Sequence, residues 1–575
     1  MLRKKGTLIV SILAAVLIFV TLVAEKPNDT LYSYIRLSSD VAFNISKRYV
    51  DDVDSKTLIY SGVKGMLDIL DPFSEFLERK DYSQLQEMTT GKYSGLGMSI
   101  MQKEGVIIVV APMEGTPAYR MGLRAGDKIL KIDGKPTNGM TTEDASSLMR
   151  GPAGTKVTLS ISREGVDEPL EYTLERAVIE IKTVPFYGTF DKNGKKLGYV
   201  RLARFGEEAN SELETAFSDL LKQNIDGIIF DLRSNGGGLL DQAVKVANYF
   251  LPKGSEVTAT KGRTLDQDRT LYASSDPMIP VGLPMAILVN EMSASASEIV
   301  AGSIQDWDRG VIIGNTTFGK GLVQQIYPLT DDAALKLTTA KWYVPSGRCI
   351  QKDSRSTRHP DMLAQEADSD STAIDTSTVK PDSATAAKKE KEIFHTKGGR
   401  IVFGGGGVVP DVDVADTRLN ALELNLERLS LFFDFSIKYT AEHPDLPEDF
   451  AVTPQIVDEF KNFLTEKKFI YKSELEADLE KLEKTIADQK KSDEYSQSLA
   501  ALRRQIDLDK EHQFVESLDY LKRSIKRDIL TKLYGEKAVY RQVLLQVDPY
   551  VERASNILTS TSEYAGILEP SSNKK

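Results

Sequence analysis

Successive patterns of apolar and polar residues divide the chain into regions. Residues 31 to about 90 carry apolar positions at helical spacing, without strand-like alternation. Residues 91–176 instead hold short β-rich runs between Gly and Pro turns, namely Val106–Val110, Lys128–Ile132, Val157–Ile161 and Leu170–Leu174. From residue 179 to about residue 414, apolar strands alternate with helical stretches, which indicates an α/β core. The chain after residue 417 is helical and charged. These patterns predict a multidomain α/β protein with helical regions at both ends.

The first 24 residues form a different pattern. Arg3, Lys4 and Lys5 precede an uncharged apolar run from Thr7 to Ala24, which as a helix would be roughly 27 Å long and would just cross the hydrocarbon core of a bilayer. The basic flank favours a cytoplasmic N-terminus, so we expect a periplasmic or extracytoplasmic protein anchored to the inner membrane. A cleaved secretory signal is the close alternative, although Leu22 fits poorly the small residue required near a cleavage site.

The patterns predict five segments and one insertion. The segments are an anchor at 1–24, a helical region at 25–90, a β-rich module at 91–178, an α/β core at 179–416 and a helical domain at 417–575. Residues 353–392 of the core are polar and lack aromatic side chains, so we expect a disordered insertion there. In the helical domain, a stripe at intervals of four, three and four is typical of a packing face: Leu475, Leu479, Leu482 and Ile486.

Composition excludes several classes of function. The net charge of −11 and the pI of about 5.3 argue against a nucleic-acid partner, which usually requires a basic face. Cys349 is the only cysteine, so the chain has no intramolecular disulfide and no cysteine-rich metal site. We expect neither a metal nor a cofactor. The four histidines lie in or beside the polar insertion or in the C-terminal helical region, outside the strands and helices of the core: His359, His395, His443 and His512.

A Gly-X-Gly loop, made by Gly95, Leu96 and Gly97, stands just before a β-rich run. Such a loop can point consecutive backbone N–H groups at one anion, because glycine lacks a Cβ atom. A simple turn is the alternative interpretation. Arg150, in a Met-Arg-Gly-Pro turn, is a candidate for contact with substrate or with the core, and it is equally compatible with a solvated turn.

A candidate nucleophile follows the apolar strand from Pro284 to Asn290. The small residues of Glu291-Met292-Ser293-Ala294-Ser295-Ala296-Ser297-Glu298 lead into a predicted helix at 299–307. A strand-to-helix turn of small residues leaves room for a substrate beside the positive end of the helix dipole. Ser293, Ser295 and Ser297 all fit either the role of nucleophile or that of an ordinary N-cap.

A serine nucleophile needs a base, and lysine is the candidate here because the core has no histidine. Lys320 lies between Gly319 and Gly321, which would permit tight burial, and a buried lysine loses its charge more easily. A surface lysine in a glycine turn is the alternative. Gln324, four residues on, would lie on the same side and could orient Lys320, unless it is an ordinary surface glutamine.

An oxyanion hole is the third requirement of acyl transfer. The strand Ile228–Asp231 runs into Ser234-Asn235-Gly236-Gly237-Gly238, and a helix follows. The backbone N–H groups of Gly237 or Gly238, together with that of Ala296, would suit an oxyanion. A glycine-rich turn before a helix can also hold phosphate, but this one lacks the Gly-Lys-Ser/Thr ending of a P-loop.

The β-rich module closely resembles the PDZ family. The resemblance rests on Gly115-Thr116-Pro117-Ala118, on Gly122-Leu123-Arg124-Ala125-Gly126-Asp127 and on Ile132-Asp133-Gly134. PDZ domains add a ligand strand to a sheet edge and hold its terminal carboxylate in a Gly-X-Gly loop. The resemblance therefore implies that the module recognises apolar or unfolded C-terminal tails of proteins.

The core resembles the carboxy-terminal processing, or tail-specific, proteases. The motifs are Asp231-Leu232-Arg233-Ser234-Asn235-Gly236-Gly237-Gly238, Ser293-Ala294-Ser295-Ala296-Ser297-Glu298 and Phe318-Gly319-Lys320-Gly321-Leu322-Val323-Gln324-Gln325. The resemblance implies a crotonase-like core, with Ser295 as nucleophile, Lys320 as general base and Gln324 orienting the lysine. It also selects Ser295 over its two neighbours. Gly236 departs from the family pattern, where proline is common, and Asp306 aligns with a residue that we expect to be structural.

The predicted function is therefore that of a serine endopeptidase that processes or degrades exported proteins from or near their C-termini. One rival is a catalytically silent PDZ scaffold at the membrane, and another is acyl-CoA chemistry, which the crotonase-like fold also supports. The sequence leaves open the physiological substrates, a homo-oligomer and a regulatory partner.

Overall fold

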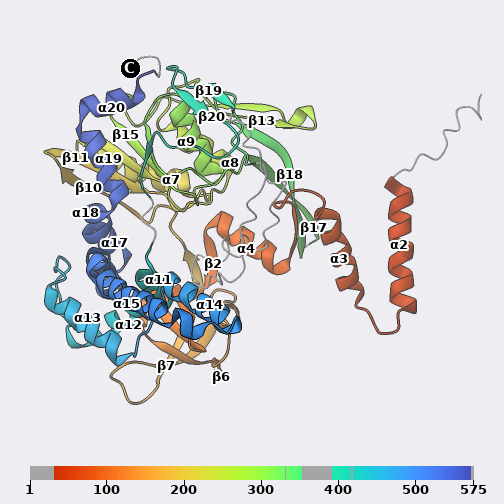
Figure 1. Ribbon diagram of the computed structural model, residues 1–575. Coiled ribbons are helices and arrows are strands. Elements are labelled where there is room, and N and C mark those ends of the chain that lie inside the picture. Colours follow the sequence, from red (N-terminus) through yellow and green to blue (C-terminus); the bar gives the residue numbers. More distant parts are fainter. Residues whose placement is uncertain (1–30, 331, 353–391, 416–418, 571–575) are drawn as a thin grey trace, which may run out of the picture. The chain divides into compact units, whose positions relative to one another are not determined.

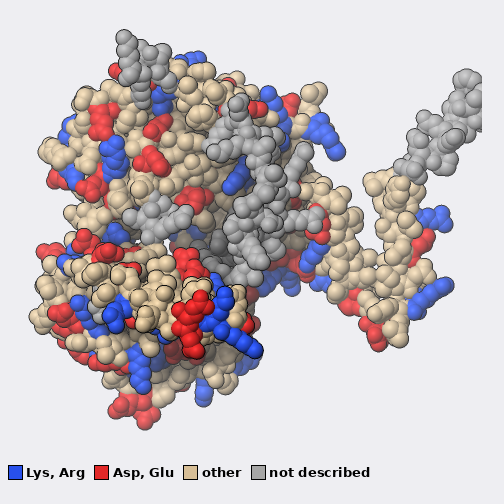
Figure 2. Space-filling view, in the orientation of Figure 1, with Lys and Arg blue, Asp and Glu red and all other residues tan. Residues whose placement is uncertain are grey.

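The computed structural model describes residues 31–570 except 331, 353–391 and 416–418, so the expected anchor and nearly all of the expected insertion lie outside it. Two compact units divide the chain, Met1–Arg79 with Gln325–Thr338 and Lys80–Gln324 with Thr339–Lys575. Within the described ranges, no helix combines the length and the apolar character needed to cross a membrane. Figure 2 shows acidic and basic side chains intermixed over one face.

The first unit contains α2 (Leu31–Arg48), α3 (Ser55–Leu67) and β1 (Glu75–Glu78). Asp54 caps α3 by accepting a hydrogen bond from the Thr57 N–H at 2.7 Å. The strand β1 pairs antiparallel with the first residues of β18 (Ala333–Tyr343). We expected residues 31–90 to be helical throughout, but they include the strand β1. Its pairing partner lies more than 250 residues away, so local spacing does not reveal it.

The second unit begins at Lys80, within α4 (Arg79–Thr90), and continues into a β-rich module (Figure 1). Its main sheet has the order β3-β4-β5-β7-β8, with β6 on β5. The strands are β3 (Met98–Lys103), β4 (Val106–Pro112), β5 (Lys128–Ile132), β6 (Lys135–Pro136), β7 (Lys156–Ser162) and β8 (Leu170–Glu175), and the helices are α5 (Pro117–Arg120) and α6 (Thr142–Met149). All four expected β-rich runs are strands. At the base of the module, β2 (Lys92–Gly95) pairs antiparallel with β9 (Ala177–Glu180).

A six-stranded sheet forms the centre of the α/β core. Its order is β10 (Phe186–Lys192), β11 (Lys195–Arg201), β12 (Gly227–Asp231), β15 (Met285–Val289), β16 (Val311–Gly314) and β21 (Val412–Asp413). Only β10 runs antiparallel to its neighbour. Every residue of β12, β15 and β16 is buried, as expected of parallel strands covered on both faces.

Helices from distant parts of the chain cover the two faces of this sheet (Figure 1). Alternate residues such as Ile228 and Phe230 pack with α7 (Ala209–Leu221), α8 (Leu240–Asn248) and α9 (Ala296–Asp306). Ile229 faces the opposite side, where α19 (Pro549–Thr559) packs through Val551 and Leu558. The segment carrying α19, which we expected in the C-terminal helical domain, is thus part of the wall of the core.

Smaller strands complete the core. β13 (Glu256–Gly262) pairs with β14 (Arg269–Tyr272) and, through its residues 259–262, with residues 340–343 of β18. β17 (Leu322–Thr330) also pairs with β18, and β19 (Ile393–His395) pairs with β20 (Ile401–Phe403). His395, which we expected outside the strands of the core, therefore lies on a strand, because its partner Ile401 follows within the same hairpin. A short 3-10 helix, η1, spans Leu265–Gln267.

The helical domain packs around its own aromatic core, in which the rings of Phe432 and Phe460 stack with centroids 5.1 Å apart. In the expected stripe, Leu479 and Ile486 are buried while Leu475 and Leu482 are 59% and 46% exposed; α14 packs mainly against α15, so only part of its stripe finds a partner. The helices are α11 (Ala421–Arg428), α12 (Leu431–Glu442), α13 (Pro454–Glu466), α14 (Glu474–Asp488), α15 (Ser492–Glu516), α16 (Leu518–Tyr534), α17 (Glu536–Val539), η2 (Tyr540–Leu544), α18 (Leu545–Val547) and, beyond α19, α20 (Thr561–Leu568).

Candidate active site

Three serines lie on the turn between β15 and α9, and only one of them is open. Ser293 is fully buried and its hydroxyl donates to the Leu232 carbonyl at 2.8 Å. Ser297 is also buried and donates to the Asn235 carbonyl at 2.8 Å. Ser295 is half-buried and has φ = 53° and ψ = −111°, a conformation rarely adopted by residues other than glycine. Such strain is frequent at functional sites.

Lys320 lies in the loop between β16 and β17 and is 8% exposed, so it is not a surface lysine. Its flanking glycines allow this burial. A Cβ atom on Gly319, which has φ = 89°, would lie 3.0 Å from the Lys352 side chain. A Cβ atom on Gly321 would lie 2.8 Å from the backbone nitrogen of Gln351. Glycine at both positions lets the neighbouring segment pack directly on the loop.

One buried carboxylate joins the Ser295 turn to the Lys320 loop. Glu298 is inaccessible to solvent, and its Oε2 accepts the N–H groups of Ser295 at 2.8 Å and of Lys320 at 2.9 Å. Its Oε1 accepts the Gly319 N–H at 2.7 Å and the Thr317 hydroxyl at 2.5 Å. Burial raises the pKa of this carboxyl, and these donors oppose the rise. Glu298 was not among the expected site residues, although its place three residues after Ser295 is that of a capping-box glutamate.

The glycine-rich turn after β12 packs against the Ser295 turn. A Cβ atom on Gly237, where φ is 105°, would lie 2.9 Å from the Ser295 Cβ and 3.0 Å from the Ala296 nitrogen. At Gly238, where φ is 139°, it would lie 2.3 Å from the Phe205 carbonyl oxygen. Nothing lies within 4 Å of a Cβ on Gly236, so the departure from the family pattern occurs where the turn is open.

Buried Asn235 organises the same turn. Its amide donates to the Leu202 carbonyl at 2.9 Å, and its Oδ1 accepts the Gly237 N–H at 2.9 Å. Its backbone carbonyl accepts the Ala294 N–H at 3.0 Å. The Gly237 amide, one of the expected oxyanion donors, is therefore engaged within the turn. Of the three expected oxyanion residues, Gly237 packs against Ser295 and Ala296, and Gly238 packs against Phe205.

A buried ionic network supports the turn from beneath. The carboxylate of Asp231 accepts hydrogen bonds from Tyr199 at 2.7 Å, from Arg201 at 2.9 Å and from Arg233 at 2.6 Å. Burial alone would raise the pKa of Asp231, but the two guanidinium groups hold it well below its usual range. Arg233 also donates to Asp548, the N-cap of α19, at 2.9 Å. The C-terminal segment is thus tied to the strand that carries the glycine-rich turn.

The other expected residues occupy distinct places. Gln324 is half-buried on β17, whereas Lys320 precedes that strand, so the two do not share one regular element and the spacing argument for a common side does not apply. Asp306, at the end of α9, is buried and pairs with Arg348 at 2.8 Å. Arg150 forms an ion pair with Glu87 on α4 and lies 5.0 Å from the centre of the Tyr93 ring, while 41% of its side chain stays exposed.

In the Gly-X-Gly loop the carbonyl groups face the interior of the module. The Leu96 carbonyl accepts the Ala118 N–H at 2.9 Å. The Gly97 carbonyl accepts the Met113 N–H at 2.9 Å and the Thr116 hydroxyl at 2.8 Å. Since the C=O and N–H of one trans peptide point in opposite directions, the N–H groups of Gly97 and Met98 point away from the interior. The loop therefore presents adjacent amide donors at the start of β3.

Comparisons with known proteins agree with this organisation. Residues 196–362 match the model of peptidase family S41, residues 108–163 match a PDZ domain, and residues 422–558 match the "Probable PDZ-protease, C-terminal helical domain".

Among curated proteins, the carboxy-terminal-processing protease of Bartonella bacilliformis is 39% identical over 342 residues, which cover 59% of this chain and 77% of that protein. The carboxy-terminal processing protease CtpA of Bacillus subtilis is 33% identical, over 54% and 65% of the two chains. A solved photosystem II D1 C-terminal processing protease is 31% identical over 56% of this chain and 85% of its own, with a TM-score of 0.35.

The α/β core, the PDZ module and the matches to the family models and the curated proteases define a serine-type peptidase. The chain belongs to the carboxy-terminal processing proteases of peptidase family S41.

Proposed function

We propose that Ser295 and Lys320 form the catalytic pair of this protease. The observation that carries the proposal is the buried carboxylate of Glu298, which accepts the backbone N–H groups of both residues and so fixes the nucleophile turn against the lysine loop. The other two serines of the turn use their hydroxyls to hold neighbouring backbone. Ser295 alone among them combines a strained backbone with partial exposure.

In the proposed reaction the neutral Lys320 amine accepts the proton of the Ser295 hydroxyl while Oγ bonds to the carbonyl carbon of a substrate peptide. The lysine then gives this proton to the leaving amine as the C–N bond breaks, and water releases the acyl group by the reverse sequence. Burial of Lys320 supports this role, because desolvation disfavours the charged ammonium form. Gln324 would orient the lysine amine by hydrogen bonding.

The oxyanion of the tetrahedral intermediate would rest on backbone amides beside Ser295. Gly238 and Ala296 are the first candidates, since the glycine-rich turn packs directly on the Ser295 turn. Gly237 would join them only after its N–H leaves the side chain of Asn235. Such preorganised donors act where charge develops in the transition state.

The PDZ module is proposed to capture the C-terminal tail of a protein substrate. The Gly97 and Met98 amides would bind the terminal carboxylate, and the tail would add a strand to the edge of β3. Gly95 and Leu96, also expected to bind substrate, would shape the loop, and the Leu96 side chain is buried. Arg150 would act as a contact between α6 and α4 rather than as a direct ligand.

An exported location, with the N-terminus in the inner membrane, rests on the sequence of residues 1–24 alone. Fractionation of cells that produce the full chain or a variant lacking residues 7–24 tests it. Recovery of the full chain in carbonate-washed membranes supports an anchor, whereas a mature N-terminus near residue 25 supports a cleaved signal. Cytoplasmic recovery of the full chain contradicts both.

The catalytic proposal is tested with an unfolded reporter that ends in an apolar tail. The wild-type chain should degrade it, whereas Ser295→Ala and Lys320→Ala should lose at least about 10³-fold in kcat/KM with unchanged thermal unfolding. Ser293→Ala is the matched control. Its kcat/KM, calculated per folded molecule, should equal that of the wild-type chain. Cleavage by both catalytic variants at the wild-type rate would refute the pair and favour another nucleophile, and tail binding without cleavage by any chain would favour a scaffold.

A further inference from the structure

The edge of β3 that would hold a substrate tail leads into a cleft beside the C-terminal helical domain. In the sheet order of the PDZ module β3 comes first, so among the described residues one of its edges pairs with no strand. The amide-presenting loop lies at the start of β3. A tail held there by its carboxylate and running antiparallel to β3 therefore has its upstream residues beside the end of that strand.

The length of β3 fixes which residues of a tail reach that end. The strand has six residues, Met98–Lys103, and a strand rises by about 3.4 Å per residue. A tail paired along the whole strand therefore places its sixth or seventh residue, counted from the C-terminus, beside Lys103 and Glu104. Residues further upstream leave the PDZ module.

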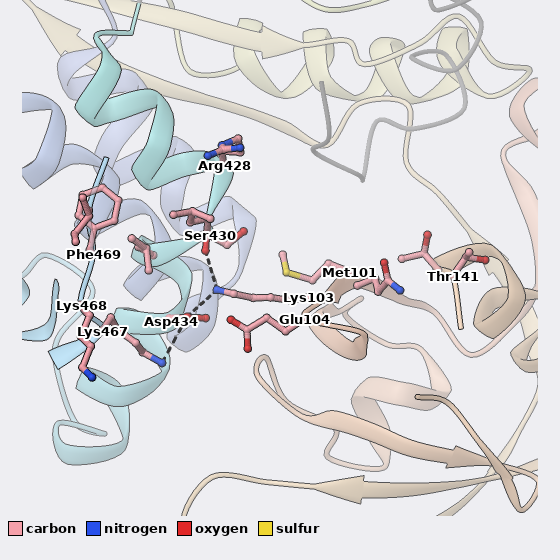
Figure 3. A pocket seen from close by; sticks show the side chains of 15 residues that line it. Met101, Lys103, Glu104, Thr141, Arg428, Ser430, Asp434, Lys467, Lys468 and Phe469 are labelled. Atoms are coloured by element: carbon pink, nitrogen blue, oxygen red, sulfur yellow. Dashed lines mark hydrogen bonds and ion pairs between the residues drawn. The ribbon is translucent and has the colours of Figure 1, made fainter. Parts of the chain in front are cut away.

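At this point the end of β3 and the start of α6 face the C-terminal helical domain across a cleft (Figure 3). The cleft has a volume of about 630 Å³. Its PDZ side includes Met101, Glu104 and Thr141, and its other side is built by the segment after α11 and by residues 467–470 after α13. Lys103 links the two sides, since its Nζ donates to the Leu429 carbonyl at 2.8 Å and pairs with Asp434 at 2.7 Å.

The cleft is basic although the chain is acidic overall, with a net charge of −11. Its charged side chains are Lys103, Arg428, Lys467 and Lys468 against Glu104 and Asp434. Asp434 lies between Lys103 and Lys467, at 2.7 and 4.0 Å, which leaves Arg428 and Lys468 as exposed cations of the helical side. Apolar surface accompanies them, since Ile470 is 87% exposed and Leu429 is 40% exposed.

We propose that this cleft is a second recognition site for the same tail, and that it selects acidic residues six to eight positions before the substrate's C-terminus. The proposal deepens the proposed capture of tails by the PDZ module and rests on it. Carboxylates at these positions would meet Arg428 and Lys468, while an adjacent apolar residue would cover Leu429 and Ile470. The helical domain would thus read sequence that the PDZ groove itself does not reach.

The test uses the full chain with Ser295→Ala, to prevent cleavage, and fluorescent 12-residue peptides that share one apolar C-terminal sequence. One peptide carries Glu at positions six to eight from its end, a second carries Gln there, and a third is the Glu peptide with an amidated C-terminus. Anisotropy titrations at low and high salt give the dissociation constants. The double variant Arg428→Gln/Lys468→Gln removes the two cations, and Lys222→Gln/Lys253→Gln, on the exposed surface of the core, is its charge-matched control.

We expect the Glu peptide to bind about 5-fold more tightly than the Gln peptide at low salt, since each partly exposed ion pair contributes a factor of about 2 to 5. High salt and the Arg428/Lys468 variant should remove that preference, and the control variant should keep it. Arg428→Glu/Lys468→Glu should reverse it in favour of a Lys-containing tail.

Equal binding of Glu and Gln peptides, with weaker binding of the amidated one, would overturn the second site while leaving tail capture by the PDZ module intact. A preference for Glu that the control variant also loses would overturn it as well, because it would reflect the net charge of the whole chain. Equal binding of the amidated and free peptides would instead refute carboxylate capture, and with it the premise of the cleft.

Discussion

The protease core and the PDZ module both use a glycine-containing loop beside a strand, but they hold these loops in different ways. In both, the glycines are required by close packing. A Cβ atom on Gly238 would lie 2.3 Å from the Phe205 carbonyl oxygen, and one on Gly97 would lie 2.4 Å from the side chain of Thr116. The fit is equally tight in the two regions, so the difference lies in what fixes each loop.

The core fixes its loops to one another. Glu298 accepts hydrogen bonds from both the Ser295 turn and the Lys320 loop. Asn235 connects the glycine-rich turn by hydrogen bonds to Leu202, just after β11, and to the Ser295 turn. In the PDZ loop, donors within the next 22 positions of the module hold the Leu96 and Gly97 carbonyls, and Gly95 pairs with Ala177 on β9 of the same module. Chemistry requires several groups at fixed mutual distances, whereas capture of a carboxylate requires one preformed loop. The comparison predicts which substitutions disturb catalysis and which disturb binding.

The largest effect is expected for Glu298→Gln, which breaks the connection within the core. A glutamine offers one acceptor oxygen where the carboxylate accepts four hydrogen bonds, and its amide would face other donors. We expect kcat/KM to fall by roughly 10²–10³-fold, with a loss of about 2–4 kcal/mol in unfolding free energy. Affinity for a tail peptide should change less than about twofold, since the PDZ loop makes no such connection.

Glu423→Gln is the matched control, because Glu423 is also buried in a capping box but bonds only the start of its own helix, α11. It should cost about 1 kcal/mol and leave kcat/KM unchanged. If Glu298→Gln retained full activity, the cross-connection would not be what positions the catalytic loops.

The next largest effect concerns the tightest glycine of the core. Gly238→Ala should destabilise the folded chain by about 1–3 kcal/mol and lower kcat/KM by roughly 10-fold to 10²-fold, because its Cβ would overlap a backbone carbonyl that cannot move without shifting the Phe205 segment. Gly236→Ala, two residues earlier, has nothing within 4 Å of its Cβ and should stay within about 0.5 kcal/mol of wild type. Chemical denaturation measures both. Equal stability of the two variants would contradict the packing argument.

The PDZ side of the comparison is tested by Gly97→Ala. Its added Cβ would overlap Thr116, which holds the Gly97 carbonyl, so the loop should lose its shape. We expect tail affinity to fall by about 10-fold or more, and cleavage of a short peptide that does not need capture to continue at the wild-type rate. Gly115→Ala is matched, with φ = 77° against 76° but with open space around its Cβ. Equal losses in the two variants would indicate backbone strain rather than the overlap.

The sequence predicted strands and motifs well where they are local. The four β-rich runs of the PDZ module and the strand before Ser295 appear as expected, since each depends on apolar patterning within a few residues. It could not predict β1, whose partner β18 is remote in sequence, nor the position of α19 on the core sheet. Both depend on contacts between segments hundreds of residues apart.

The same limit applies to the candidate site. Spacing alone did not separate Ser295 from Ser293 and Ser297, because their different hydroxyl partners, Leu232 and Asn235, come from another strand-turn segment. It also missed Glu298 as the residue between the two loops, since two of its four donors follow it by more than 20 positions. The capping-box spacing was visible in the sequence, but the hydrogen bonds that Glu298 accepts from the Lys320 loop were not.

The smallest expected effect is on the free energy of unfolding, and it arises where the PDZ module meets the helical domain. Lys532 on α16 donates to the Ile437 carbonyl at 3.4 Å, and Ile437 in turn lies against Gly126 of the module. Burial lowers the pKa of Lys532 from 10.5 to about 8, although Asp127 opposes this shift. Between pH 8 and 10.5 the unfolded chain therefore binds more protons than the folded chain, so stability should rise with pH across this window.

Below pH 8 the folded chain must hold Lys532 charged in a half-buried place, which costs about 1 kcal/mol after allowance for solvent screening. Lys532→Met should therefore raise the unfolding free energy at pH 7 by about that amount and remove the rise at alkaline pH. Lys222→Met, at an exposed position of the core, should change neither. If Lys532→Met were less stable at pH 7, the hydrogen bond to Ile437 would outweigh the cost of burying the charge, and this contact would be as firmly fixed as the catalytic loops.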